Sequence, residues 1–145
     1  MGGRYDRRMV DTCSVVLDTN VFVAAEFNTK SSSARVLGAV RRGSLRMIWN
    51  SATRHETRSI LEKIPPLSWE AVAGLFRQED RVDVEARDES FPQIPDPEDR
   101  KFARLAHAVG AILISQDKHL LAQPHRMDLL VLTPREFLSG SWKAV

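Results

Sequence analysis

Four acidic residues, far apart in the chain, stand where a strand is expected to end or a helix to begin. Asp18 closes the first strongly apolar run, and Asp117 follows a later one. Glu56 and Asp99 lie near the starts of two expected helices. Because right-handed crossovers begin each such helix at the carboxyl edge of a parallel sheet, we expect the four carboxylates to meet at that edge. For Asp18 taken alone, the alternative is that it only caps the helix that follows.

Four converging carboxylates repel one another and would take up protons unless a cation joined them. Oxygen ligands, with no cysteine pair and no paired histidines, favour Mg²⁺ or Mn²⁺ over zinc. Metals on such a cluster can hydrolyse a phosphodiester, because they lower the pKa of a bound water, orient it and stabilise the departing oxygen. The chain has no Gly-x-Ser-x-Gly elbow and no Gly-rich phosphate loop. The pattern therefore predicts phosphodiester hydrolysis without a protein nucleophile.

The histidines and the cysteine show no spacing typical of a metal site or a nucleophile. The four histidines are expected to be ordinary surface or packing residues, and His55 stands out only because it precedes Glu56. Cys13 is the single cysteine, so no internal disulfide can form, which agrees with a reducing compartment. At the head of a predicted strand, Cys13 is expected to be a small buried residue.

Apolar runs alternate with amphipathic segments along the chain. The predicted strands span residues 14–17, 45–49, 81–84, 111–115 and 129–132. Helices are expected to begin near residues 19, 34, 51, 69, 97, 116 and 134. Strands that alternate with helices indicate an α/β fold, with a central parallel sheet of about five strands covered on both faces.

The length and composition indicate one domain. We expect a flexible N-terminal lead-in over residues 1–12, the domain over 13–140 and a C-terminal tail over 141–145. No apolar stretch is long enough to span a membrane and the start does not look like a signal peptide, so we expect a cytoplasmic protein. A net charge of +2 does not by itself indicate a nucleic-acid partner, although arginine outnumbers lysine and its planar fork suits phosphates.

Four segments together resemble the PIN domain, in their order and in their spacing. They are Val15–Val21, Asp96–Phe102, Ile114–Leu121 and Val131–Leu138. The resemblance runs from about residue 14 to residue 138. It is strongest to the single-domain prokaryotic branch of the family, the toxins of toxin–antitoxin pairs related to VapC.

This resemblance implies a three-layer α/β/α fold and a metal-dependent endoribonuclease. The residues that match the family's acidic quartet, as catalytic residues and as ligands of Mg²⁺ or Mn²⁺, are Asp18, Glu56, Asp99 and Asp117. Asn20, Ser115 and Asp96 match as supporting polar residues, with Asp96 interpreted as a helix cap and Asp99 as a residue of the first turn. The family usually has Thr where this chain has Ser115, so the hydroxyl is kept. Glu62 is the alternative to Glu56.

Basic residues flank the four acids and could contact RNA phosphates. They are Arg54, Arg58, Arg100, Lys101 and Lys118. The alternative for each is a place on a solvated helix face. The toxin resemblance further implies an RNA substrate, a small antitoxin encoded beside the gene and a homodimer.

Two other classes of protein compete with the nuclease hypothesis. A PIN-like module could bind RNA or a protein partner without turnover. A phosphoacceptor receiver domain is also a parallel α/β fold with a Mg²⁺-binding acidic cluster. That fold expects paired acids after its first strand and a lysine after a late strand, where this chain has Asp18 alone and Thr133-Pro134.

Overall fold

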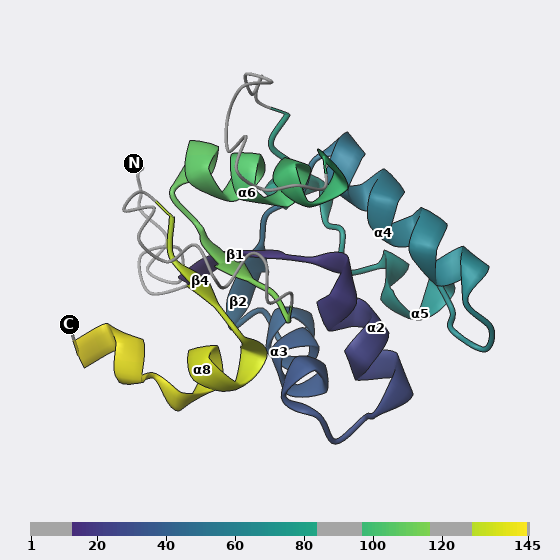
Figure 1. Cartoon of the computed structure of the whole chain (residues 1–145), viewed down its shortest axis with the longest axis horizontal. Helices are drawn as coiled ribbons and strands as arrows, with labels where there is room; N and C mark the ends of the chain where they lie inside the picture. The colour runs from purple at the N-terminus through teal and green to yellow at the C-terminus, as the bar shows by residue number, and fades with distance from the viewer. Residues whose placement is uncertain (1–12, 84–96, 117–128, 145) are drawn as a thin grey trace.

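A computed structural model of the chain describes residues 13–83, 97–116 and 129–144 (Figure 1). Of residues 97–99 and 144, only the backbone is described. Several predictions fall outside the described residues: the lead-in 1–12, the helix after residue 116, and the positions Asp96, Asp117 and Lys118.

The described part of the chain forms a parallel sheet of four strands. They are β1 (Cys13–Leu17), β2 (Leu45–Met47), β3 (Ile112–Ile114) and β4 (Val131–Leu132). The spatial order is β2-β1-β3-β4, so β1 lies between two neighbours. Val15 pairs with Met47 on one side and with Ile112 on the other. The predicted α/β class and the parallel sheet are confirmed.

The strand expected at residues 81–84 does not form within the described residues. In its place a single parallel bridge joins Trp49 to Arg81, and the Val82 N–H donates to the Trp49 carbonyl over 2.8 Å. The physical reason is that the next helix begins at Ser51, shortly after β2 ends at Met47. Only Trp49 is then left as an extended partner, so residues 81–83 form one bridge and no strand. The sheet of the described chain therefore has four strands where about five were expected.

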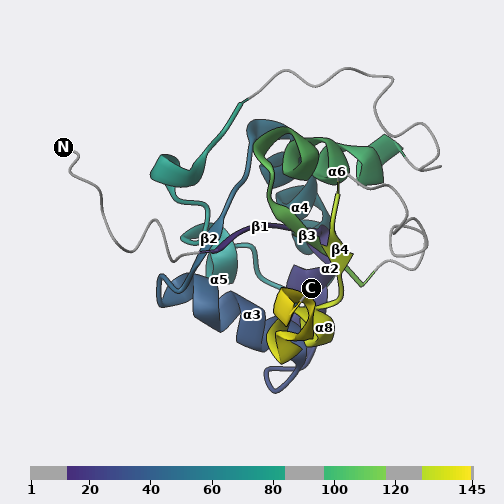
Figure 2. The ribbon, with the colours of Figure 1, turned by 90° about the vertical axis from the view of Figure 1, so that its left-hand side faces the viewer.

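Helices cover both faces of the sheet. They are α2 (Thr19–Phe27), α3 (Ser32–Arg41), α4 (Ser51–Lys63), α5 (Glu70–Ala73), α6 (Pro97–Val109) and α8 (Pro134–Ser139), with the 3-10 turns η1 (Gln78–Asp80) and η2 (Ser141–Ala144). Figure 2 shows α6 on one side of the strands, with α3 and α8 on the other. α4 contacts both α2 and α6. Among the described helices, none has the length and apolar character needed to cross a bilayer.

Alternating side chains of the strands divide the core into two layers. Val15 and Leu17 of β1 belong to the cluster formed with α2 and α3, whereas Val16 packs with Phe102 and its neighbours on α6. Neighbouring residues of a strand point to opposite faces, so a continuous apolar run can bury both. Because both faces of these strands are apolar, each face needs a covering layer of helices. The result is the three-layer arrangement.

The start of α4 is fixed by a reciprocal capping box. The Asn50 side chain accepts from the Thr53 N–H over 2.8 Å, and the Thr53 hydroxyl lies 3.1 Å from the Asn50 N–H that donates to it. This cap fixes which residues face the core: Thr53, Thr57 and Leu61, each four residues apart. The cap therefore also fixes the direction in which Glu56 and Arg54 leave the helix.

Candidate active site

Asp18 lies directly after β1, at the carboxyl edge of the sheet. Its N–H donates to the Ile114 carbonyl over 3.0 Å, which extends the pairing of β1 with β3. The backbone of Asp18 has the extended conformation of an N-cap, but its side chain makes no capping hydrogen bond to α2. Instead, Oδ2 accepts from the Ser115 hydroxyl over 2.7 Å and from Asn20 Nδ2 over 3.3 Å. The capping alternative for this carboxylate is therefore wrong.

Ser115 and Asn20 meet Asp18 at the same edge, although Ser115 lies 97 residues further along the chain. The Asn20 amide also reaches the Ser115 hydroxyl, with 3.4 Å between Nδ2 and Oγ. Asp18 is 4% exposed and Ser115 is fully buried. A buried carboxylate needs donors to replace its lost hydration, and these two residues supply them.

Gln116 is a third residue with side-chain or backbone contacts at this edge, and no pattern in the sequence predicts its role. Its N–H donates to Asn20 Oδ1 over 3.0 Å, and its side-chain Nε2 donates to the buried Ser33 hydroxyl on α3 over 3.3 Å. The chain that leaves β3 is thus held at two points immediately before Asp117. A glutamine in a polar turn has no distinctive pattern, so only the tertiary contact identifies it.

Glu56 lies on the side of α4 that faces α6. Its Oε1 is 3.8 Å from Lys101 Nζ, and both side chains are about one-fifth exposed (22% and 21%). Lys101 is in the second turn of α6, and Asp99 is in the first. Glu56 therefore lies beside the part of α6 that carries Asp99. Lys101, predicted as a contact for RNA phosphates, has this carboxylate as a neighbour.

A buried pair of threonines joins the helices that carry Asp18 and Glu56. The hydroxyls of Thr19 and Thr57 are 2.9 Å apart, and each residue directly follows one of the two acids. Both threonines are buried. This contact holds the start of α2 against α4, so it brings the backbones of Asp18 and Glu56 close together.

Glu62, the alternative to Glu56, lies on the outer side of α4. It forms an ion pair with Arg58 over 3.1 Å, with both side chains about half exposed. Arg58 and Arg54 also lie over the ring of Trp69, at 5.8 and 5.0 Å from its centroid. This geometry favours Glu56 over Glu62 as the acid nearer to Asp18.

The two predicted arginines on α4 are thus placed beside α5, and Arg100 lies on α6 with partial exposure. Among the side chains that the structure describes, no group of three or more histidines, cysteines or carboxylates is placed to hold a metal ion. The Asp99 side chain and Asp117 are outside that set. The meeting of all four acids stays a prediction. Asp18 and Glu56 offer oxygen donors, which fit a hard divalent cation.

Cys13 lies at the other end of β1, at the amino edge of the sheet. Burial raises the pKa of its thiol, and the positive charge of Lys143 only partly opposes this. A raised pKa keeps the thiol protonated at neutral pH and hence weakly nucleophilic. This agrees with a packing role and leaves the carboxyl edge as the candidate site.

The fold is a three-layer α/β arrangement with a buried carboxylate at the carboxyl edge of its parallel sheet. A family model of the PIN domain matches residues 14–119, which is more than half of the chain. The chain therefore belongs to the PIN domain family, whose members are generally nucleases and typically bind divalent metal ions. No curated protein shows significant similarity to the chain.

The threonine contact between α2 and α4 can be tested by a double-mutant cycle. Thr57→Val should lower the free energy of unfolding by about 1–3 kcal/mol, because the buried Thr19 hydroxyl loses its partner. Thr19→Val should have a similar effect. The double variant should lose less than the sum of the two, as urea unfolding followed by circular dichroism will show. Additive losses would contradict a direct hydrogen bond.

Proposed function

We propose that the protein is an endoribonuclease that depends on a divalent metal ion and hydrolyses RNA phosphodiesters. The observation that carries this proposal is the Asp18 carboxylate, buried at the carboxyl edge and held by Ser115 and Asn20 instead of capping α2. Burial of a carboxylate is costly unless hydrogen bonds or a cation compensate for lost hydration. Membership of the PIN domain family supports the same function.

Mg²⁺ or Mn²⁺ is the proposed cofactor, since the donors at this edge are carboxylate oxygens. The residues that would hold it are Asp18, Glu56, Asp99 and Asp117. When bound, such an ion supplies a water of lowered pKa and stabilises charge on the departing oxygen. The chain's own part is to fix the carboxylates: Ser115 and Asn20 both donate to Asp18 Oδ2, which sets the orientation of that group.

Basic residues beside the acids are the proposed contacts for the RNA backbone. Lys101, 3.8 Å from Glu56, and Arg100 lie near the start of α6. Lys118 follows Asp117 in the sequence. Cations at these positions would offset the repulsion between carboxylates and an approaching phosphate.

A PIN domain that binds RNA without cutting it is the main alternative. The acids at the predicted positions favour turnover, but only a cleavage assay separates the two functions. The receiver-domain alternative has no support from the family match, and β1 is followed by one acid where that fold expects two.

Replacement of Asp18 tests the proposed chemistry. Asp18→Asn keeps the shape of the side chain but removes its charge, so it should lower RNA cleavage about 100-fold or more. Cleavage of a mixed panel of structured and single-stranded RNAs would be followed on gels with Mg²⁺, Mn²⁺ or EDTA. Wild-type protein should cut only with metal. Equal products from wild type and variant would indicate a contaminating nuclease, and circular dichroism would confirm that the variant is folded.

The two glutamates of α4 form a matched pair of variants. Glu56→Gln should lower the cleavage rate at least about tenfold, since an amide cannot replace a ligating carboxylate. Glu62→Gln should leave the rate within about twofold, because its exposed pair with Arg58 contributes little. Single-turnover rates at saturating Mg²⁺ and saturating RNA, which do not depend on RNA affinity, provide the measurement. The reverse order of effects would assign the site to Glu62.

The proposed biological role is that of the toxin in a toxin–antitoxin pair in the cytoplasm. It rests on the resemblance to the single-domain prokaryotic branch of the family. A small antitoxin would block the acidic edge, and the toxin would act as a homodimer.

Induced expression in a bacterial host tests this role. Wild-type protein should arrest growth, and Asp18→Asn at equal protein level should not, because the arrest requires RNA cleavage. Growth curves and quantitative immunoblots are the measurement. Co-expression of the small reading frame next to the gene should restore growth. Unimpaired growth with active nuclease in the lysate would refute a toxin role.

A further inference from the structure

A depression of about 470 Å³ lies between the first turns of α4 and the α5–η1 segment, on the opposite side of α4 from Glu56. Residues that line it include Trp49, Arg54, His55, Phe76, Gln78 and Arg81. We call it the α4–η1 pocket. Its volume is within the range of roughly 300–1,000 Å³ that small-ligand sites occupy.

Two arginines at this pocket lie over buried tryptophan rings. The guanidinium carbon of Arg54 is 5.0 Å from the centroid of Trp69, and that of Arg81 is 5.4 Å from the centroid of Trp49. Both tryptophans are 5% exposed, so they form a rigid base. The cation–π attraction holds each guanidinium near its ring, and N–H groups that do not face the ring can still donate. Such a fork matches the oxygens of a phosphate.

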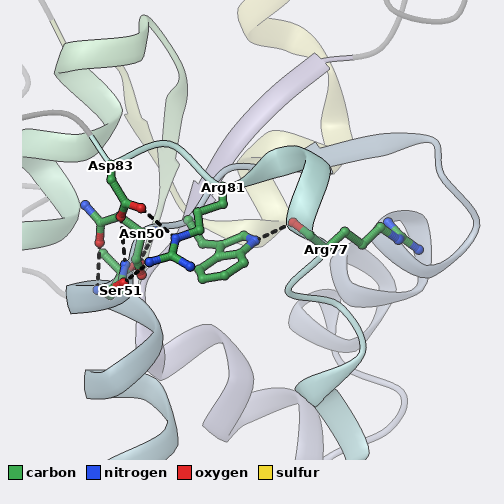
Figure 3. A network of polar contacts seen from close by, with 7 residues as sticks. Asn50, Ser51, Arg77, Arg81 and Asp83 are labelled. Atoms are coloured by element: carbon green, nitrogen blue, oxygen red, sulfur yellow. Dashed lines mark hydrogen bonds and ion pairs between the residues drawn. The ribbon is translucent and has the colours of Figure 1, made fainter.

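The two arginines differ in their polar partners. Arg81 donates to Asp83 Oδ2 and to the Ser51 hydroxyl, each over 2.6 Å, as Figure 3 shows. Its position is therefore fixed and its charge is partly balanced. The Arg54 side chain makes no hydrogen bond or ion pair with any residue in the described ranges, and its guanidinium lies over the ring of Trp69. The donors of Arg54 are the ones that a ligand in the pocket can use.

A second depression of about 410 Å³ continues the α4–η1 pocket along the outer side of α4. It shares Arg54 and His55 with the first and extends to Arg58 and Lys63. The two depressions are lined by four cationic side chains, Arg54, Arg58, Lys63 and Arg81. Arg58 is paired with Glu62 and Arg81 with Asp83, so the excess of positive charge comes from Arg54 and Lys63. An elongated site with this excess of positive charge suits a chain of phosphates better than one compact anion.

The geometry points to the α4–η1 pocket as a binding site for a backbone phosphate of single-stranded RNA, with Arg54 as its main donor. This inference rests on the proposed function, since it places one strand on both the pocket and the acidic edge. Glu56 faces α6 two residues after Arg54, so α4 alone separates the two sites. A helix is about 10–12 Å across with its side chains, a width that a few nucleotides of a strand can span.

Binding of an RNA strand in EDTA tests the pocket separately from cleavage. The probe is a fluorescein-labelled single-stranded 12-mer, followed by fluorescence anisotropy against the full-length protein. Arg54→Gln should raise Kd about tenfold, the size expected for a lost charged hydrogen bond. It should also lower the slope of log Kd against log salt concentration by about 0.7, the value for one phosphate of a single strand.

Arg42→Gln is the matched control, since Arg42 is exposed at the C-terminal end of α3, just before β2 and hence near the amino edge. It removes the same charge and should change Kd less than twofold. Arg54→Lys keeps the charge without the fork and should lie between wild type and Arg54→Gln. Circular dichroism melts of each variant would show that the fold is kept.

Each outcome separates the pocket from the proposed function. Equal losses of RNA affinity in Arg54→Gln and Arg42→Gln would show that the effect comes from the net charge of the protein. That result would overturn the inference. Unchanged RNA affinity of Arg54→Gln, with metal-dependent cleavage lost in Asp18→Asn, would refute the pocket while the nuclease stands. Weakened binding without any cleavage would support the pocket and refute the nuclease. Inorganic phosphate or a mononucleotide could also displace the labelled 12-mer. If either did so completely and bound as tightly as the 12-mer, the assignment of the pocket to an RNA strand would be overturned.

Discussion

The buried carboxylate of Asp18 is the constraint on which the site depends. A carboxylate that leaves water must find hydrogen-bond donors or a cation, or its burial destabilises the fold. Here β1 lies between β2 and β3, and Asp18 still donates its N–H to the neighbouring strand. The residue after β3, Ser115, is thereby brought to the carboxylate with 2.7 Å between their oxygens. The pairing of β1 with β3 therefore determines both the sheet and the site.

Three sides of the helix α4 contact three different parts of the molecule. Thr57 faces inward and touches Thr19, next to Asp18. Glu56 faces α6 and lies beside Lys101. Arg54 faces Trp69 on the opposite side. Because a capping box fixes the rotation of α4 at Asn50, a change there would move all three contacts together.

Much of this arrangement could be predicted from the sequence because it follows from topology. The apolar runs that end at Asp18 and precede Ser115 are strands, and parallel strands bring their carboxyl ends to one edge. The strand expected at 81–84 could not be excluded in this way, since its loss depends on where α4 begins. The contacts of Gln116 and Thr57 were missed for a related reason: a hydrogen bond between distant polar residues leaves no periodic pattern. The roles of Asp99 and Asp117 remain predictions from the motif.

A cluster of carboxylates is a poor place for an RNA strand unless positive charge lies nearby. The net charge of +2 gives no hint of such a balance, because charges of both signs are spread along the chain. Their distribution on α4 is more informative: Glu56 faces α6, while Arg54 and Arg58 lie over the ring of Trp69 on the other side. Attraction between charges weakens beyond about 8–10 Å in physiological salt. A helix width of about 10–12 Å exceeds this range, so the arginines on the far side of α4 would hold a strand only by direct contact with its phosphates. At that distance they would not neutralise carboxylates that bind a metal ion.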